Sequence, residues 1–430
     1  MSERAIRIGI LGCGTVGAAT IRLLDEHADD ITMRAGCRLE VTRVAVRDLH
    51  RDRDVPLPCD AFTDDASSIV DDADIDVVCE LLGGVEPAKG LLLRAIANGK
   101  SVVTANKELL ATEGKALFDA ADAAGLDLLF EASVAGGIPL VRPLKESLAG
   151  ERVGRMLGIV NGTTNYILTQ MTEHASTFGE ALAEAKRLGY AEADPTADVE
   201  GFDAAAKCAI LASIAFNSRV VAGDVYREGI AGITAVDIAD ARRMGYVVKL
   251  LAIAELEGGE ISARVHPAMI PEAHPLAAVR DAFNAVFVEG EKVGQLMFYG
   301  PGAGGDATAT AVVGDLVTAA RNRAIGGRSM GCTCVLDRRI RSMDDTRGQY
   351  YLNLHVADRP GVLAEIAGDF AHNGVSIERV WQEGSADEAT LVLITHRAQE
   401  GALQKTLQEL RESPAVRSVA SVLRVEGEEP

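Results

Sequence analysis

The chain has 430 residues, which is long enough for two or three domains that each bury a core of their own. It is 48% hydrophobic and 25% charged with a net charge of -20, which disfavours a nucleic acid or an anionic membrane as partner and favours a small zwitterion or cation. No apolar run reaches the roughly 20 residues of a membrane helix, and residues 1–7 lead into a strand pattern rather than a signal peptide, so we expect no membrane partner and a cytoplasmic protein.

A glycine turn follows the first predicted strand. Residues 6–11 form an almost continuous apolar run, which Gly12-Cys-Gly14-Thr15-Val16-Gly17 closes before an amphipathic helix at 18–25. Gly12 permits the tight turn, Gly14 lets the backbone approach a pyrophosphate, and Gly17 permits close packing of helix on strand. The turn, including Thr15 and Val16, is therefore predicted to bind a nicotinamide dinucleotide, and a purely structural turn is the alternative.

The second predicted strand, residues 39–46, ends in Arg47-Asp48. An acid at this position binds the ribose hydroxyls, whereas an arginine accommodates a 2'-phosphate. Arg47 therefore favours NADP and Asp48 keeps NAD open, while a surface arginine without a role is equally compatible with the sequence.

Strands at 75–79, 101–104 and 126–130 alternate with helices at 87–98 and 108–124, which predicts an α/β fold with a doubly wound (Rossmann) parallel sheet. Ligands of such sheets lie beyond the carboxyl ends of the strands. Thr104-Ala-Asn106-Lys107 occupies one of those ends, so Thr104 and Lys107 are expected to face the cofactor and substrate.

Residues 131–140, EASVAGGIPL, form a glycine-rich turn that either offers carbonyl oxygens to a cation or tightens a crossing between domains, and the tight crossing is favoured. After a strand at 157–160, the polar stretch from Asn161 through Thr163 to Tyr166 suits a small amino acid at the head of a helix. A second glycine-rich helix start at Gly304 is expected to add amide donors to the cofactor, unless it is only a flexible linker.

An acidic turn precedes a lysine-bearing helix in residues 189–207. If that helix runs over 200–216, Asp203 and Lys207 lie four residues apart on one face, where an acid orients an ammonium group. An ordinary solvated salt pair is the alternative.

These motifs together resemble the homoserine dehydrogenase family over residues 6–325. The resemblance implies NAD(P)-dependent interconversion of L-homoserine and L-aspartate 4-semialdehyde on the way to threonine and methionine. It further implies two lysines beside the reacting oxygen, with Lys207 as the proton donor. It also implies that Glu192 binds the substrate amino group and that Asp198 and Asp203 line the substrate site. A sodium-binding turn is implied at Glu131, Val134, Gly136 and Ile138. Gly189 is expected beside the cofactor, and Ala193 stands where many members carry proline.

Residues 326–348 are predicted to be a connector with some strand at 332–336. It holds two of the seven cysteines; their odd number and the absence of a CxxC pair indicate neither disulfides nor zinc, so we expect them to be small apolar fillers.

Residues 349–430 show a βαββαβ pattern, typical of a ferredoxin-like unit. The turn Asp358-Arg-Pro-Gly361-Val362-Leu363, followed by Asn373-Gly374, resembles an ACT domain, a module that often binds amino acids. In this family the implied effector is L-threonine, bound at the start of the helix that Gly361 opens. A domain that only dimerises is the alternative.

The expected organisation is a dinucleotide-binding domain (1–133), an α+β substrate and dimerisation domain (134–325), the connector (326–348) and the ACT domain (349–430), in a homodimer or homotetramer. Two other functions stay open: a dehydrogenase of a different semialdehyde, and an amino-acid sensor with a relic dinucleotide fold. NADPH oxidation with aspartate semialdehyde separates the three.

Overall fold

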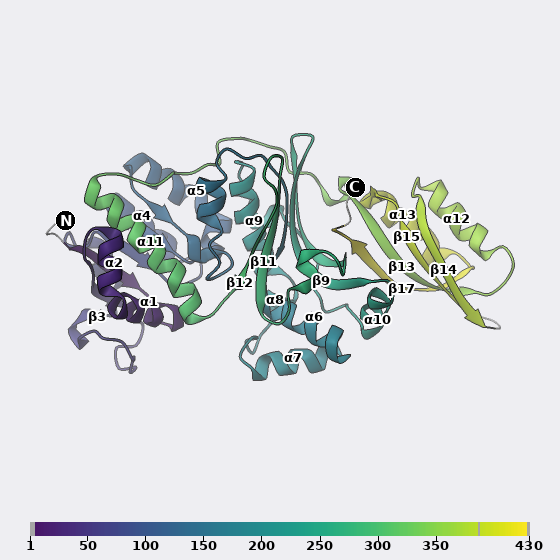
Figure 1. Ribbon diagram of the computed structural model, residues 1–430, viewed down its shortest axis with the longest axis horizontal. Helices are drawn as coiled ribbons and strands as arrows, with labels where there is room; N and C mark the ends of the chain where they lie inside the picture. Colours follow the sequence, from purple (N-terminus) through teal and green to yellow (C-terminus); the bar gives the residue numbers. More distant parts are fainter. Residues whose placement is uncertain (1–4, 386–387, 428–430) are drawn as a thin grey trace.

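The computed structural model describes residues 5–385 and 388–427, which form an elongated molecule with the first sheet at one end and the ACT-like unit at the other (Figure 1). No helix in these ranges is long and apolar enough to cross a membrane.

The first sheet is parallel, with the strand order β3-β2-β1-β4-β5-β6. Helices α1, α2 and α11 cover one face and α3, α4 and α5 cover the other, so the predicted doubly wound sheet is confirmed. The strands are β1 (Ile6–Leu11), β2 (Leu39–Ala45), β3 (Phe62–Thr63), β4 (Val77–Glu80), β5 (Ser101–Thr104) and β6 (Leu128–Leu129). The helices are α1 (Thr15–Glu26), α2 (Ala28–Ala35), α3 (Ala66–Asp71), α4 (Ala88–Ala97), α5 (Lys107–Ala124) and α11 (Gly305–Ile325).

Helix α11 returns from the second part of the chain to the first sheet (Figure 1). Its Asp315 is buried and accepts hydrogen bonds from the Glu131 amide at 2.8 Å and from the Arg142 guanidinium at 2.6 Å. A buried carboxylate is tolerated only when it is paired in this way. The contact fixes the two parts of the chain on either side of the predicted crevice.

A mixed sheet forms the middle of the molecule, in the order β12-β11-β7-β9-β10. Its strands are β7 (Val153–Ile159), β8 (Tyr226–Arg227), β9 (Tyr246–Glu257), β10 (Glu260–Pro271), β11 (Phe283–Gly290) and β12 (Gly294–Pro301). Its helices are α6 (Gly162–His174), α7 (Phe178–Arg187), α8 (Thr196–Val199), α9 (Phe202–Ala215) and α10 (Ala235–Arg243), with a π-helix at Pro143–Ser147.

The helix expected over 200–216 is broken at its start. Gly201 has a φ of 78°, which ends α8 and lets α9 begin at Phe202. Asp203 and Lys207 still lie one turn apart on α9.

The last unit has the strand order β17-β13-β15-β14, which confirms the ferredoxin-like prediction. Its elements are β13 (Arg347–Ala357), α12 (Val362–His372), β14 (Ile377–Ser385), β15 (Glu388–Thr395), β16 (Ala398–Gln399), α13 (Glu400–Glu412) and β17 (Val416–Val425).

The sequence did not predict how this unit joins the rest of the chain. Strand β17 also pairs in parallel with β10, through Ala268 with Arg424 and Met269 with Val425, so the middle and last sheets are continuous. Next to this junction, Glu426 forms an ion pair with the buried Arg264 at 2.9 Å and a second with Arg155. The strand expected at 332–336 is not formed; only Leu336 makes an isolated bridge, to Ser218.

Candidate active site

The glycine turn lies at the carboxyl end of β1, where the strand order reverses between β1 and β4. A Cβ on Gly12 would lie 2.7 Å from the Leu81 carbonyl oxygen, and one on Gly17 would lie 2.3 Å from the Gly12 carbonyl oxygen. These two glycines are thus required by packing. Gly14 caps α1, and the space in front of its Cα is open, so a ligand can approach the backbone there.

A second helix start lies against the first. A Cβ on Gly305 would lie 3.0 Å from the Thr15 methyl carbon, and Gly304, which precedes it, opens onto free space with a φ of 118°. The amino ends of α1 and α11 therefore meet at the glycine turn. Free amides and the positive ends of two helix dipoles favour a pyrophosphate at this place.

Arginines surround the same turn on the side of β2. Arg47 is exposed just beyond β2, and the following loop carries Arg51 and Arg53. Burial raises the pKa of the Cys13 thiol inside the glycine turn, whereas Arg53, Arg22 and Arg51 pull it down. Positive charge thus reaches the turn, and the sequence analysis singled out only Arg47 of this group.

The carboxyl ends of β4 and β5 are joined by Glu80, a residue that the sequence analysis missed. Its buried carboxylate accepts hydrogen bonds from the Thr104 hydroxyl at 2.6 Å and from the Leu82 and Gly83 amides at 2.7 and 3.1 Å. The hydroxyl of Thr104 is therefore used to shape the crevice. A glutamate at the end of a buried strand was the signal available in the sequence.

Lys107, at the start of α5, meets Asp203 and Lys207 of α9. The Lys107 ammonium lies 3.1 Å from Asp203 Oδ1, and the Lys207 ammonium lies 2.7 Å from Asp203 Oδ2 and 2.7 Å from the Val160 carbonyl oxygen. Asn106 orients the first lysine, because its side chain caps α5 by accepting from the Leu109 amide at 3.1 Å. One carboxylate therefore holds two lysines that come from different domains.

The electrostatics of the cluster follow from burial and charge. Burial alone would raise the pKa of Asp203, but Lys207 and Lys107 outweigh it and hold that pKa well below its usual range. The charge of Asp203 raises the pKa of Lys107 against the opposing effect of burial. An ionised Asp203 between two ammonium groups leaves these three side chains with one net positive charge, which suits a substrate oxygen that gains negative charge.

Asn161 connects this cluster to Asp198. Its amide donates to Asp198 Oδ1 at 2.7 Å and to Asp203 Oδ2 at 2.9 Å, while its own oxygen caps α6. Burial raises the pKa of Asp198, an effect that the hydrogen bond from Asn161 opposes. The structure thus brings together Asn161, Asp198, Asp203 and both lysines.

The turn with Glu192 lies at the rim of this group. The Thr163 hydroxyl donates to the Tyr190 carbonyl oxygen at 2.5 Å, which fixes the turn to α6, and Glu192 is exposed two residues further on. Gly189 has a φ of 79°, and its amide donates to the Lys186 carbonyl oxygen at 3.1 Å. The contacts of Gly189 are those of a residue that ends helix α7.

The turn expected to hold sodium is closed by its own glutamate. The carboxylate of Glu131 accepts from the amides of Leu140, Val141 and Arg142 at 2.5 to 2.8 Å. These bonds fix the turn without a cation, so the side chain of Glu131 does not fit the role of a free ligand. Val134 and Ile138 are buried beside it, and Gly136 packs against the Gly302 carbonyl.

In the last unit, Asp358 and Gly361 are exposed at the start of α12, where Val362 is buried and Leu363 is 44% exposed. Asn373 lies at the opposite end of α12 and donates to Glu409 of α13 at 2.7 Å. The structure therefore gathers the DRPGVL turn but separates Asn373 from it.

A glycine turn at the switch point of a parallel sheet, with a lysine pair across the crevice, defines an NAD(P)-dependent oxidoreductase of a small polar substrate. Comparison with known families narrows the class. The family model "Homoserine dehydrogenase, NAD binding domain" matches residues 12–131, "Homoserine dehydrogenase" matches 139–317, and "ACT domain" matches 350–415. The chain belongs to the homoserine dehydrogenase family.

Relatives match over the full length. The homoserine dehydrogenase of Corynebacterium glutamicum is 50% identical over 98% of this chain and 96% of its own, and that of Bacillus subtilis is 44% identical over 99% of both. The crystal structure of a homoserine dehydrogenase from Thiobacillus denitrificans superimposes with a TM-score of 0.92 at 41% identity, covering 99% of each chain. A hyperthermophilic archaeal homoserine dehydrogenase in complex with NADPH gives a TM-score of 0.61 at 27% identity over 74% of this chain and 98% of its own.

Proposed function

We propose that the chain interconverts L-homoserine and L-aspartate 4-semialdehyde with NADP as the preferred cofactor, in the biosynthesis of threonine and methionine. The observation that supports this most directly is the Lys107, Asp203 and Lys207 cluster across the crevice from the glycine turn. When bound, a nicotinamide cofactor supplies or accepts the hydride. The protein then has to orient the substrate and manage one proton on its oxygen.

In this proposal the Lys207 ammonium donates the proton to the carbonyl oxygen of the semialdehyde and takes it back in the reverse direction. Asp203 and the Val160 carbonyl oxygen hold the Lys207 side chain, which is only 12% exposed. Lys107 stabilises the same oxygen from the other domain. Asp198, Asn161 and Thr163 position the substrate, and Glu192 at the rim binds its amino group.

The test of this mechanism is Lys207→Ala, assayed by NADPH oxidation with aspartate semialdehyde and by direct NADPH binding. Turnover should fall by at least about a hundredfold, because a general acid is lost, while the NADPH dissociation constant changes little. Lys115→Ala is the matched control, since Lys115 and Asp119 form another i, i+4 lysine–acid pair, on the exposed side of α5. Near-normal turnover of Lys207→Ala would refute the assignment.

The preference for NADP rests on Arg47, which follows β2 at the position that reads the ribose, and on Arg51 and Arg53 of the next loop, whose charge reaches the glycine turn. Gly12, Gly14, Thr15, Val16, Gly17 and Gly304 are the proposed pyrophosphate contacts. Asp48 keeps weaker use of NAD open, because its Oδ1 is engaged only by the exposed His50 amide, at 2.9 Å.

We propose that L-threonine inhibits the enzyme through the ACT domain, by binding at the exposed start of α12 formed by Asp358, Gly361, Val362 and Leu363. Strand β17 and Glu426 connect this domain directly to β10 of the middle sheet, which supports a mechanical effect of binding. Asp358→Ala should weaken threonine inhibition and leave uninhibited turnover unchanged, with Glu412→Ala at the far end of α13 as control. Equal threonine inhibition of the two variants would place the effector site elsewhere. Asn373 is not part of the proposed site, because it lies at the opposite end of α12.

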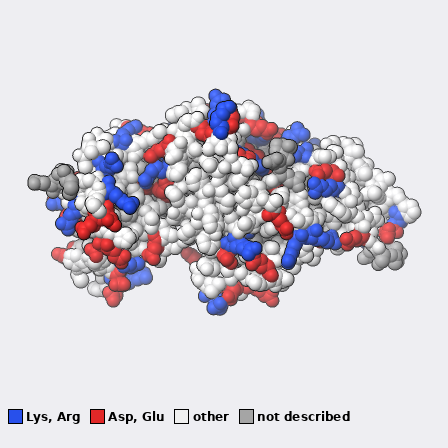
Figure 2. All heavy atoms as spheres, viewed as in Figure 1, with Lys and Arg blue, Asp and Glu red and all other residues white. Residues whose placement is uncertain are grey.

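Association into a homodimer or homotetramer is supported by an uncharged face over β11 and β12 (Figure 2). Tyr299 there is 54% exposed and stacks on Phe283 with ring centroids 5.3 Å apart, and Met297, two residues earlier on the same strand, is also exposed. Large exposed apolar patches are typical of contacts between chains. Light scattering tests this, because Tyr299→Asp should have a smaller molar mass in solution than the unchanged protein.

The remaining finer assignments are also proposals. Any sodium at residues 134–138 would be held by backbone carbonyl oxygens, with the Glu131 side chain only shaping the turn; exchanging sodium for potassium in the assay tests it. We also propose a cytoplasmic location and a chain of four parts, with boundaries between residues 133 and 134, 325 and 326, and 348 and 349.

A further inference from the structure

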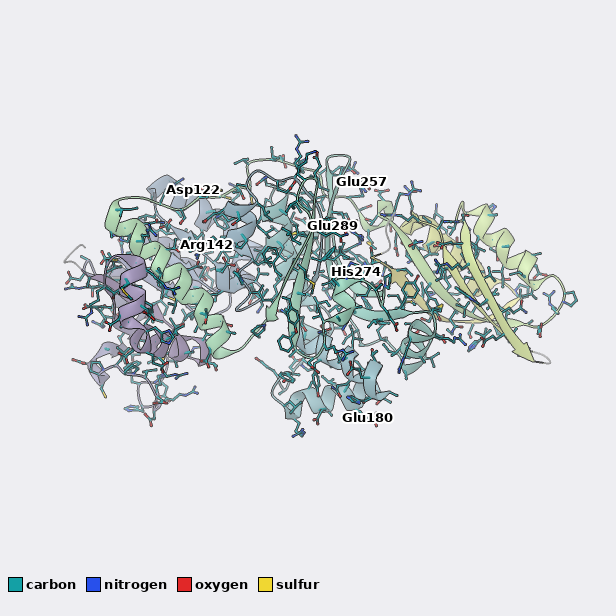
Figure 3. The ribbon with its side chains drawn as sticks, in the orientation of Figure 1. Asp122, Arg142, Glu180, Glu257, His274 and Glu289 are labelled. Atoms are coloured by element: carbon teal, nitrogen blue, oxygen red, sulfur yellow. The ribbon has the colours of Figure 1, made fainter. Side chains whose placement is uncertain are left out.

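Two cysteines of the connector lie together on its path along α5 and α9. The Cys332 amide donates to Asp122 Oδ2 at 3.1 Å, Asp122 being on α5 (Figure 3). The Cys334 thiol donates to the Ser213 carbonyl oxygen on α9 at 3.6 Å. Two residues apart, both cysteines line the same cavity, and each thiol shifts the pKa of the other. This differs from the expectation that all cysteines are apolar fillers.

The cavity beside the pair is small, with a volume of about 30 Å³. Its walls are mostly apolar, and two cations, Lys145 and Arg219, also line it. Both cysteines are only partly buried, so a small solute reaches them from solvent. A partly exposed thiol among cations is the setting in which cysteine becomes reactive.

The two thiols differ in acidity. The hydrogen bond from Cys334 lowers the pKa of Cys332, and Arg219 contributes in the same direction, whereas burial and Asp122 oppose it. By contrast, burial raises the pKa of Cys79 and Cys208, which lie inside the protein. The connector pair is thus chemically distinct from these buried cysteines.

We propose that Cys332 and Cys334 are a reversible oxidation site that a hydroperoxide converts into a disulfide. The Cys332 sulfur attacks one peroxide oxygen, the O–O bond breaks, and the leaving oxygen takes up a proton as water, which leaves a sulfenic acid. The Cys334 sulfur then attacks this sulfur, the S–O bond breaks, and a second water leaves. In total, the two thiols lose two hydrogen atoms and one hydrogen peroxide is reduced to two waters.

The product has a consequence for the connector. A disulfide between residues two apart closes a small ring, and strained, accessible disulfides are the easily reduced, regulatory ones. Its formation also withdraws the Cys334 thiol from Ser213, on the helix that carries Asp203 and Lys207. Oxidation therefore changes a contact between α9, which carries Asp203 and Lys207, and the connector that leads to the ACT domain.

The test treats the full-length protein with hydrogen peroxide, alkylates the remaining thiols, and analyses tryptic peptides by mass. The peptide 329–338 contains both cysteines. It should escape alkylation, weigh two hydrogens less than its reduced form, and regain both alkylation sites after dithiothreitol. Oxidation of Met330 in the same peptide is recognised because it adds an oxygen instead.

Controls separate the site from general thiol oxidation. Cys332→Ser and Cys334→Ser should each abolish the two-hydrogen loss, whereas Cys59→Ser, which changes an exposed cysteine elsewhere, should leave it intact. The folded protein should form the disulfide about tenfold faster than the urea-unfolded chain, since only the fold supplies the cations and the thiol contact. Equal rates in the two states, or recovery of both cysteines fully alkylated or as sulfinic acids, would overturn the proposal.

Discussion

Asp203→Asn is the most informative single change, because this carboxylate alone holds both lysines. The substitution keeps the shape of the side chain and removes its charge. The Lys207 contact lies between side chains that are 12% and 10% exposed, so it counts as a buried charge-assisted bond of about 1.5–3 kcal/mol. The Lys107 side chain is 42% exposed, so its contact is worth about 0–1 kcal/mol after solvent screening.

Together these contacts amount to about 1.5–4 kcal/mol, and each 1.4 kcal/mol is a factor of ten. If they are needed in the transition state, kcat/KM for aspartate semialdehyde should fall roughly 10- to 1000-fold. The assay is initial-rate NADPH oxidation, with thermal unfolding recorded on the same preparations.

Asp194→Asn is the matched control, because Asp194 lies in the same acidic segment but bonds only to Thr196. A folded Asp203→Asn enzyme whose kcat/KM stays within about twofold of this control would refute the reasoning. The two lysines would then keep their positions without the carboxylate.

Three further predictions concern the cofactor site and pH. Gly14→Ala should weaken NADPH binding about tenfold, measured by calorimetric titration, and leave the melting temperature unchanged. Gly17→Ala should lower the free energy of unfolding by about 1–3 kcal/mol, measured by thermal unfolding, because its Cβ would lie 2.3 Å from the Gly12 carbonyl oxygen. Arg47→Ala should raise the dissociation constant for NADPH about tenfold and leave that for NADH unchanged, with the exposed Arg34→Ala as control; equal losses for both cofactors would contradict a 2'-phosphate contact. The depressed pKa of Asp203 means that its carboxylate stabilises the fold above the unfolded pKa of about 3.9 and that this contribution is lost as the pH falls toward the folded pKa. The stability difference between wild type and Asp203→Asn, from urea unfolding, should therefore shrink between about pH 6 and about pH 3, and a constant difference would contradict it.

The sequence predicted the fold class of all three units, because apolar periodicity and glycine turns are local signals. It also predicted that Asp203 and Lys207 share one face of a helix, because their spacing is a local signal, and the structure places Lys107 beside them. Contacts between distant segments escaped it: Glu80 bonds to Thr104, 24 residues away, and Asp315 to Glu131, 184 residues away. No local pattern encodes which buried acid meets which partner.

The break at Gly201 and the closed Glu131 turn show a second limit. Gly201 lies where helical periodicity alone would continue the helix, but its φ is 78°, and a Cβ there would lie 3.3 Å from side-chain carbons of Arg227 and Val265. The carboxylate of Glu131 found three backbone donors in its own turn. At Gly201 the backbone conformation interrupts the helix expected from periodicity, and at Glu131 hydrogen bonds within the turn engage the carboxylate.

The pairing of β17 with β10 imposes an order on folding during synthesis. Strand β10 is made before the whole ACT domain, so its outer edge and the guanidinium of Arg264 stay without β17 and Glu426 until that domain has emerged. Until then Glu255 of β9 pairs with Arg264, while the segment of the β10 edge that later receives β17 stays open and invites misassembly of the nascent chain. The ACT domain thus completes the middle sheet, and a chain shortened before β17 would expose an aggregation-prone edge in addition to leaving the ACT domain without its last strand.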